Sequence, residues 1–297
     1  MTIIFIVGLL FIAIYLVVFK LLGLTVIGSD EVAVIEKWWS TKGNLAQGKL
    51  ISLDGEAGFQ PDMLRAGIHL LPRFMFRVHK FPMIVIPQGQ IGYVFARDGQ
   101  AMKNTQLLGR EVECSNFQDT RAFLKNGGQK GPQRAILREG AYAINLAQFI
   151  VITKNQVFSL PGTGNIDLET INSMKSNISS RNGFEPVVIK EERVNYQNST
   201  RTLDLMGIVT VHEGRALPSG EIIAPTVGDD SNNEDTYHNS FQTPEAFLNA
   251  GGYKGKQEQV IADGTYYINR LFATVEIAHK TVVPMGYTAV VNSFAGE

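Results

Sequence analysis

The sequence predicts an α+β protein in which an N-terminal transmembrane helix precedes a series of small β-rich units with short docked helices. Three observations predict this class. The first is a long apolar run at the N-terminus, and the second is an internal repeat in the body of the chain. The third is the alternation of apolar and polar residues in short segments between glycine turns, which is typical of strands.

The apolar run covers residues 1–27 and predicts the transmembrane helix. Ile3 to Phe19 is nearly uninterrupted, Lys20 breaks the run, and residues 21–27 resume it. A helix needs about 20 apolar residues to cross roughly 30 Å of hydrocarbon, and a lysine near its end can extend its amine to the interface. A cleaved signal peptide is the alternative, but the run lacks a basic start and a small-residue cleavage site.

Positive charge lies only on the C-terminal side of this segment. Lys20, Lys37 and Lys42 follow its main apolar run, whereas no lysine or arginine precedes it. Flanking segments rich in lysine and arginine stay on the cytoplasmic side of a membrane. We therefore expect a single-pass protein with an N-terminal anchor and a cytoplasmic body.

Two stretches of the body repeat each other without a gap. Residues 115–145 and 239–269 are identical at 14 of 31 positions, at a constant offset of 124. The shared pattern includes an Ala-Phe-Leu segment, a pair of glycines and a closing Gly-x-Tyr-x-Ile-Asn segment. A constant register over this length indicates a duplicated structural unit.

Weaker copies of this unit lie before and after the duplicated pair. The opening strand at 86–99 recurs at 207–214 and at 283–296, and faintly at 28–35. The expected β units therefore occupy residues 28–86, 87–206 and 207–282, and a further unit starts at 283–297. This last unit has room for only one strand, so we expect the chain to be the N-terminal part of a longer protein that continues past Glu297.

Capping residues predict a short helix inside each duplicated stretch. In the second copy, Thr243 and Pro244 begin the helix and Gly251 ends it. Asp119 and Gly127 have the corresponding positions in the first copy. These residue types are typical of helix starts and helix ends.

A longer helix is expected over residues 167–180, because Ile171, Met174 and Ile178 recur there at helical spacing. Most other segments alternate with a period of two. Strands are expected at 32–37, 84–86, 92–96, 149–152, 208–211, 274–277 and 288–291.

Composition excludes several functional classes. The net charge is −1 and the sequence pI is about 6.5, so the basic field that nucleic-acid binding needs is missing. Cys114 is the single cysteine, which excludes a disulfide within the chain and a multi-cysteine zinc site. Its place in an alternating segment favours an ordinary strand residue over a nucleophile.

The candidates for chemistry are weak. The loop from Gly127 to Gly131 resembles a phosphate loop, but it follows a helix instead of opening one, so the helix dipole has the wrong sign for an anion. Its duplication favours a structural turn. Glu276 and His279 lie three apart on an expected strand and therefore on opposite faces. The five histidines, none in a paired metal spacing, are His69, His79, His212, His238 and His279. We expect no catalytic residue, no cofactor and no metal site.

An N-terminal apolar helix followed by these β units resembles the SPFH or Band 7 family of stomatin, prohibitin and flotillin relatives, in particular the large bacterial flotillin-like branch. The segments that carry the resemblance are Ile86–Val94, Gly131–Gln133, Gly140–Asn145, Gly207–Gly214 and Val282–Tyr287. The charged, heptad-rich tail through which such proteins oligomerise is missing from these residues.

The resemblance implies a membrane-anchored, oligomerising, non-catalytic scaffold that organises membrane microdomains or partner membrane proteins. It implies membrane lipids, further copies of the chain, and membrane proteases or other membrane proteins as partners, and no nucleic acid. We expect edge strands of the repeated units to pack laterally against neighbouring copies.

Two other functional classes stay open. The first is a tethered binding or adaptor module for lipid, glycan or a membrane protease, in which Trp38, Trp39 and Tyr253 contact the ligand. Exposed rings would favour it, although packing of the two tryptophans under the first strand pair is the expected role. The second is a tethered enzyme that uses the duplicated pairs Lys130/Lys254 and Gln133/Gln257.

Overall fold

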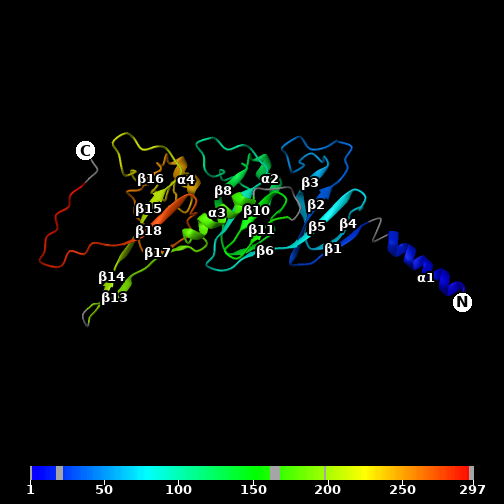
Figure 1. The fold of residues 1–297 in the computed structure, drawn as a ribbon, viewed down its shortest axis with the longest axis horizontal. Coiled ribbons are helices and arrows are strands. Elements are labelled where there is room, and N and C mark those ends of the chain that lie inside the picture. The colour runs from blue at the N-terminus through cyan, green and yellow to red at the C-terminus, as the bar shows by residue number, and fades with distance from the viewer. Residues whose placement is uncertain (1, 18–22, 161–167, 197–198, 294–297) are drawn as a thin grey trace.

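Three small β units lie in a row in the computed structural model of the chain, with helix α1 at one end and an extended C-terminal segment at the other (Figure 1). The structure describes residues 2–17, 23–160, 168–196 and 199–293. Strand pairing groups the elements into units 1, 2 and 3, which begin at β1, β6 and β12. These starts precede the expected second and third units by one or more strands.

Unit 1 consists of β1 (Leu24–Ile27), β2 (Glu31–Lys37), β3 (Gly58–Leu64), β4 (Gly67–Leu70) and β5 (Phe76–Pro82). Unit 2 consists of β6 (Ile84–Ile86), β7 (Gly92–Ala96), α2 (Thr120–Lys125), β8 (Gly131–Leu137), β9 (Gly140–Tyr142), β10 (Phe149–Ile152) and β11 (Val157–Phe158). Unit 3 consists of β12 (Val187–Ile189), β13 (Glu192–Tyr196), β14 (Ser199–Leu203), β15 (Leu205–Val211), α4 (Pro244–Asn249), β16 (Gly255–Lys256), β17 (Gly264–Tyr266) and β18 (Ala273–His279).

The three units share one topology. A central sheet has the order β3-β2-β5 in unit 1, β8-β7-β10 in unit 2 and β16-β15-β18 in unit 3, and β11 extends the second of these. A two-stranded sheet in each unit pairs its first strand with its fourth, as β1-β4, β6-β9 and β12-β17. All of these pairs are antiparallel. In unit 3 the hairpin β13-β14 is inserted after the first strand.

One backbone hydrogen bond shows how closely the units correspond. It joins the residue after the central strand to the residue before the last strand, at 2.8 Å in every unit. The donor and acceptor are Trp38 N and Met75 O, Arg97 N and Gln148 O, and His212 N and Phe272 O. The sequence repeat is therefore also a structural repeat that includes unit 1.

The core of each unit lies between its two sheets. In unit 2, Ile84 and Ile86 from the two-stranded sheet face Val94 and Phe149 from the central sheet, and all four are buried. Helix α2 closes this core by inserting Phe123, whose ring lies 4.9 Å from that of Phe149. In α2, the Asp119 side chain accepts a hydrogen bond from Ala122 N, as the capping pattern predicts.

Helix α3 (Leu168–Ser180) covers the outer face of the central sheet of unit 2. It lies where helical spacing predicts a helix, and Ile171 and Ile178 are buried against Tyr93 and Ile150. The Tyr93 hydroxyl donates to Gly183 O at 2.7 Å, and its burial raises the pKa of this phenol to about 12.

Two turns of the duplicated stretches adopt unusual backbone conformations. Residues Ser115–Phe117 and Asn239–Phe241 all have positive φ, between 45° and 64°. A left-handed backbone conformation costs roughly 1–2 kcal/mol for each residue other than glycine. The turns place Phe117 and Phe241 in the cores, where both rings are buried.

The expected transmembrane helix over residues 1–27 is wrong. Helix α1 (Thr2–Tyr15) has 14 residues, which at about 1.5 Å per residue is shorter than roughly 30 Å of hydrocarbon. Leu24–Ile27, the end of the apolar run, forms strand β1 and pairs with β4. Among the described residues, no helix is long and apolar enough to cross a membrane.

Two further expectations change with this result. The single-pass membrane anchor that placed the body in the cytoplasm is wrong, since it depended on that helix. The α+β class is wrong too, because the described residues form mostly small antiparallel sheets with few helices. The apolar run is long enough to predict a transmembrane helix, but its last residues pair with another strand instead.

Candidate functional site

The residues considered for catalysis are not brought together. Cys114 is buried, and its burial raises the pKa of the thiol, which disfavours the nucleophilic thiolate. His79 contacts Glu36, whereas His212 contacts Arg181, the residue that follows helix α3 (Leu168–Ser180). In the described part of the chain, no three His, Cys, Asp or Glu side chains could hold a metal ion.

The duplicated glycine loop has a structural role in both units. Gly127 and Gly251 end α2 and α4 at positive φ. A Cβ on the following residue would lie 2.5 Å from the Phe123 ring in one copy and 2.1 Å from the Phe247 ring in the other. Lys130 and Lys254 extend into solvent.

The duplicated glutamines bind their own backbone. The side-chain amide of Gln133 donates to the carbonyl oxygens of residues 129 and 131 at 2.8 Å. Gln257 makes the same two contacts in unit 3, and Gln60 makes them in unit 1. These hydrogen bonds stabilise the strand that carries each glutamine.

The contact between units 1 and 2, called joint 1, centres on two buried side chains of unit 2. The Asn145 amide donates to the carbonyl oxygens of Gln60 and Pro61 in β3, at 3.0 and 3.2 Å. The Asp98 carboxylate accepts hydrogen bonds from the backbone N–H groups of Leu50 and Ile51, at 2.7 and 3.2 Å.

The contact between units 2 and 3, called joint 2, repeats this arrangement. The Asn269 amide donates to the carbonyl oxygens of Gln133 and Arg134 in β8, at 3.1 and 2.8 Å. Glu213 lies at the position of Asp98 and accepts from Leu107 N at 3.3 Å. The two asparagines thus bind equivalent carbonyl oxygens of the preceding unit, and Glu213 binds one of the two N–H positions that Asp98 binds.

Joint 2 adds a buried ion pair. Arg134 donates to Glu213 at 2.9 Å and to Glu245, at the start of α4, at 2.7 Å. Burial by itself lowers the pKa of the Arg134 guanidinium, but the hydrogen bonds and charges of the two carboxylates outweigh burial and raise this pKa. Arg134 is therefore a cation in the folded protein.

One surface feature recurs at the first strand of each unit. Val26, Val85 and Val188 occupy the same register position in β1, β6 and β12, and their exposed fractions are 54%, 61% and 47%. We call these three residues the valine stripe. Strands β1 and β6 run along the same side of the row (Figure 1).

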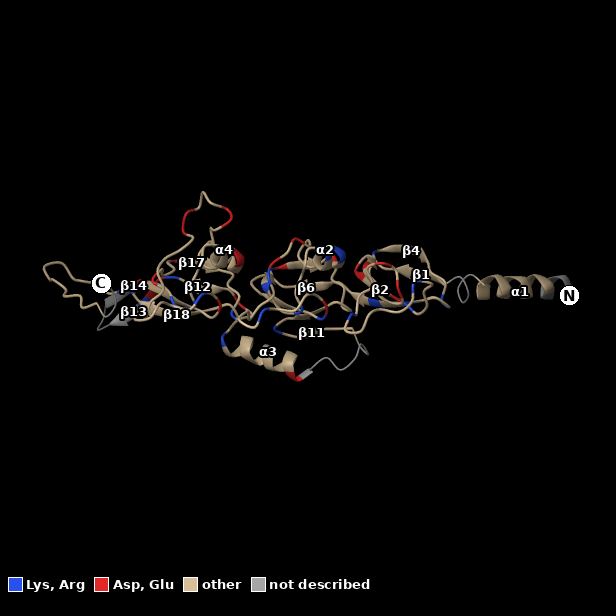
Figure 2. Ribbon diagram, turned by 90° about the horizontal axis from the view of Figure 1, so that it is seen from above, with Lys and Arg blue, Asp and Glu red and all other residues tan. Residues whose placement is uncertain are grey.

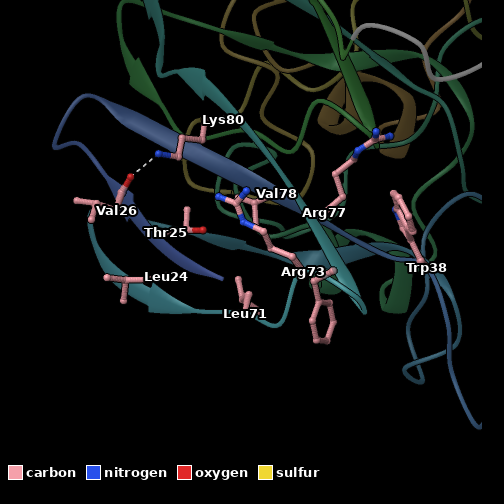
Figure 3. Close-up of a pocket in the computed structure, with 10 residues that line it drawn as sticks. Leu24, Thr25, Val26, Trp38, Leu71, Arg73, Arg77, Val78 and Lys80 are labelled. Atoms are coloured by element: carbon pink, nitrogen blue, oxygen red, sulfur yellow. Dashed lines mark hydrogen bonds between the residues drawn. The ribbon is translucent and has the colours of Figure 1, made fainter. Parts of the chain in front are cut away.

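A cavity of about 490 Å³ opens on unit 1 between β1 and β5 (Figure 3). Its described lining includes Arg73, Arg77 and Lys80 and no acidic residue. The Arg77 guanidinium lies 5.2 Å from the centre of the Trp38 ring, a cation–π geometry. Leu24, Leu71 and Val78 supply an apolar floor beside these cations.

Both tryptophans are exposed, and the expectation that they pack under the first strand pair is wrong. The exposed fractions of Trp38 and Trp39 are 57% and 60%. Trp39 stands at the position that Asp98 and Glu213 occupy in the later units. The described residues before unit 1 form helix α1 and not a β unit.

Sequence reasoning missed the joint residues although their signal was present. Asn145 and Asn269 end the repeated Gly-x-Tyr-x-Ile-Asn segment, and Pro72 replaces them in unit 1. A polar residue that recurs only in the units with a predecessor is the pattern expected of a contact between units.

Comparison with known proteins gives no relative. The chain matches no protein-family model, no curated protein and no solved structure. The resemblance to the SPFH or Band 7 family therefore has no support from these comparisons. Functional conclusions rest on the geometry of the units and joints.

Proposed function

We propose that this protein is a non-catalytic scaffold, a stiff row of β units that associates with further copies of itself and holds partner proteins at fixed spacing. The observation that carries the proposal is the repeated joint. Asn145 and Asn269 are 0% and 1% exposed, and each binds two carbonyl oxygens of the preceding unit. Buried, hydrogen-bonded contacts of this kind favour a single arrangement of neighbouring units.

The valine stripe supports lateral association of copies. A single exposed valine is ordinary on a protein surface, but three at the same position form a periodic apolar row. A second copy that aligns with the row meets three equivalent contacts at once. Each contact strengthens the others because binding at one unit raises the local concentration at the next.

Sedimentation of the full chain between about 1 and 100 µM tests the proposal, since weak lateral contacts saturate in this range. We expect species larger than 32.8 kDa whose proportion rises with concentration. Replacing Val26, Val85 and Val188 together by threonine keeps a β-branched shape and should shift the chain to the monomer.

The matched control is Val260→Thr, because Val260 is also exposed (47%) but lies outside the stripe. This variant should sediment like the parent protein. A parent chain that is monomeric over the whole range would contradict self-association, and equal effects of both substitutions would contradict the role of the stripe.

A second candidate function is a binding module, favoured by the exposed Trp38 and the basic cavity of unit 1. Three cations beside an apolar floor fit an amphipathic anion, a carboxylate or phosphate group attached to a short hydrocarbon chain. Both tryptophans of the chain lie in unit 1, so tryptophan fluorescence reports on this site directly.

Octyl phosphate and inorganic phosphate, each titrated against octyl glucoside as a neutral control, would test this module. A saturable change with octyl phosphate alone indicates that charge and hydrocarbon both contribute. Arg73→Gln should weaken that response, whereas Arg65→Gln, outside the cavity, should leave it unchanged. Equal responses to octyl phosphate and octyl glucoside would contradict an anion site.

A further inference from the structure

The end of unit 3 that faces away from unit 2 carries the same groups to which a following unit is docked in joints 1 and 2. We call it the distal face, formed by Ile222, Ile223, Gln257 and Glu258. Ile223 corresponds to Ile51 of unit 1 and Leu108 of unit 2. The correspondence follows from the next residue, because Ala224 N bonds Lys256 O at 2.8 Å just as Ser52 N bonds Phe59 O.

Burial of these residues depends on whether a unit follows. Ile51 and Leu108 are 3% and 2% exposed, whereas Ile223 is 37% exposed. Unit 3 thus keeps a large apolar residue, Ile223, at a position that a following unit covers elsewhere in the chain.

The hydrogen-bonding groups of the joint are free on the distal face. Among the described residues, none donates a hydrogen bond to the carbonyl oxygens of Gln257 and Glu258, which correspond to the acceptors of Asn145 and Asn269. The N–H groups of Ile222 and Ile223, which correspond to those bound by Asp98, likewise have no acceptor in the described part of the chain.

The residues that follow β18 in unit 3 also resemble the residues that follow β5 in unit 1. Residues 273–286 align with residues 76–89, and the turn bond of Tyr287 N to Pro284 O, at 3.1 Å, repeats that of Gln90 N to Pro87 O. Val283 is 45% exposed and Val290 is 97% exposed, whereas their counterparts Ile86 and Tyr93 are buried.

We propose that the distal face docks a further β unit of the same type, which presents an asparagine amide to Gln257 and Glu258 and a carboxylate to Ile222 and Ile223. This inference rests on the proposed scaffold, and it names the partner that extends the row. Unit 1 of a second copy does not fit, because Pro72 and Trp39 replace the asparagine and the acid.

The charge at the edge of the distal face indicates which charge the partner unit carries. Glu258 stands where Arg134 stands in unit 2, and Arg134 binds Glu245 at the start of α4. The corresponding residue of α2 is Arg121, and Figure 2 shows the opposite charges of these two helices. The partner unit therefore carries a basic residue at the start of its helix, as unit 2 does.

The test places such a unit on the distal face. Residues 280–297 are replaced by a second copy of residues 83–186, so that unit 2 with its covering helix follows β18 as it follows β5 in the parent chain. Hydrogen–deuterium exchange of Ile222 and Ile223 is the readout. We expect their amide exchange to slow by about tenfold or more relative to the parent chain, the effect of one to two joint hydrogen bonds.

The matched control carries Asn145→Asp in the added copy only. The aspartate still accepts the turn bond that Asn145 accepts from Ala147 N, but it no longer donates to carbonyl oxygens. Slow exchange at Val94 and Val151 of the added copy shows that it has folded. We expect the control to fold and to restore much of the fast exchange at Ile222 and Ile223.

Two results would overturn the inference. One is an added unit that is folded but leaves Ile222 and Ile223 exchanging as in the parent chain. The other is protection of both residues in the parent chain that rises with its own concentration, because a second copy would then be the partner. A parent chain that stays monomeric in sedimentation contradicts the proposed scaffold and leaves this test intact.

Discussion

Joints 1 and 2 use the same backbone groups but opposite side-chain charges. In both, an asparagine and an acid of the following unit bind carbonyl and N–H groups of the preceding one. In joint 1 the following unit supplies the cation, Arg121, to Asp62, whereas in joint 2 it supplies the anion, Glu245, to Arg134. Contacts to backbone define how units stack, and pairs of side chains distinguish one joint from the other.

The two ion pairs also differ in burial, and this difference gives the largest predicted effect. Arg134→Met leaves the Glu213 carboxylate, whose side chain is 4% exposed, without its counter-charge. Loss of one partner of a buried pair costs roughly 3–5 kcal/mol. We expect this loss in the free energy of unfolding from urea titrations at neutral pH.

The corresponding change in joint 1 is Arg121→Met. Arg121 is 34% exposed and Asp62 is 70% exposed, so solvent screens the pair and the expected loss is at most about 1 kcal/mol. Equal losses in the free energy of unfolding from Arg121→Met and Arg134→Met would show that burial does not determine how much each ion pair contributes. A triple variant with Arg134→Met, Glu213→Gln and Glu245→Gln should recover part of the larger loss, because no charge is then left unpaired.

The asparagines should behave alike in the two joints, since both contact backbone. Asn145→Asp and Asn269→Asp each remove two donors and place a carboxylate against carbonyl oxygens in a buried site. We expect each to lower the free energy of unfolding by about 2–3 kcal/mol. A clear loss for one variant and none for the other would contradict a shared joint.

Asn292→Asp is the matched control for these substitutions. Asn292 is an exposed asparagine in the C-terminal segment, outside both joints. Its replacement by aspartate should change the free energy of unfolding by less than about 0.5 kcal/mol.

Much of this organisation follows from the sequence, and its limits have physical causes. The register of residues 115–145 and 239–269 predicts a duplicated unit, and capping residues predict α2 and α4. Thr243, however, makes no side-chain capping bond, although Pro244 at the first helical position favours the start of the helix. Local signals thus predict where an element starts better than which contact holds it.

The failures concern contacts that join distant segments. The apolar composition of residues 24–27 is compatible with a helix or a strand, and only pairing with β4 decides between them. Trp38 has an apolar side chain, but it lines the open cavity of unit 1 and its ring contacts Arg77, so it remains exposed. The joint asparagines were visible as a repeat, but their role required the position of the preceding unit.

The glutamines that bind their own backbone give a smaller effect that depends on the joint. Gln133 supports the strand segment to which Asn269 is bound, whereas Gln257 supports the equivalent segment on the distal face. Loss of the side-chain hydrogen bonds costs about 1 kcal/mol in each case. We expect Gln133→Ala to lower the free energy of unfolding by more than Gln257→Ala does, because Gln133→Ala also loosens joint 2. Urea titrations of both variants would measure this difference. A larger loss from Gln257→Ala would contradict the comparison.

The smallest predicted effect is a pH dependence of stability that unit 3 should show and unit 2 should lack. His238 stands in unit 3 where Cys114 stands in unit 2; its Nε2 donates to Val227 O, and its Nδ1 accepts from Phe241 N at 2.8 Å. Burial lowers the pKa of His238 below its ordinary value of 6.5, although the bond to Val227 opposes this. The stability that neutral His238 supports is therefore present above about pH 6.5 and is lost as pH falls toward the lowered pKa.

His238→Cys tests this assignment because it gives unit 3 the residue that unit 2 already has. Between pH 7.5 and 5, the protection of the Phe241 and Phe247 amides, measured relative to the intrinsic exchange rate at each pH, should fall in the parent chain, by no more than the tenfold per pH unit that one proton allows. The equivalent Phe117 and Phe123 of unit 2 should lack this histidine-dependent change. This loss of protection in unit 3 should disappear in the variant, since Cys114 shows that the same fold accommodates a thiol there. If it persisted, another titrating group would be responsible, and the difference between the two units would not lie at this position.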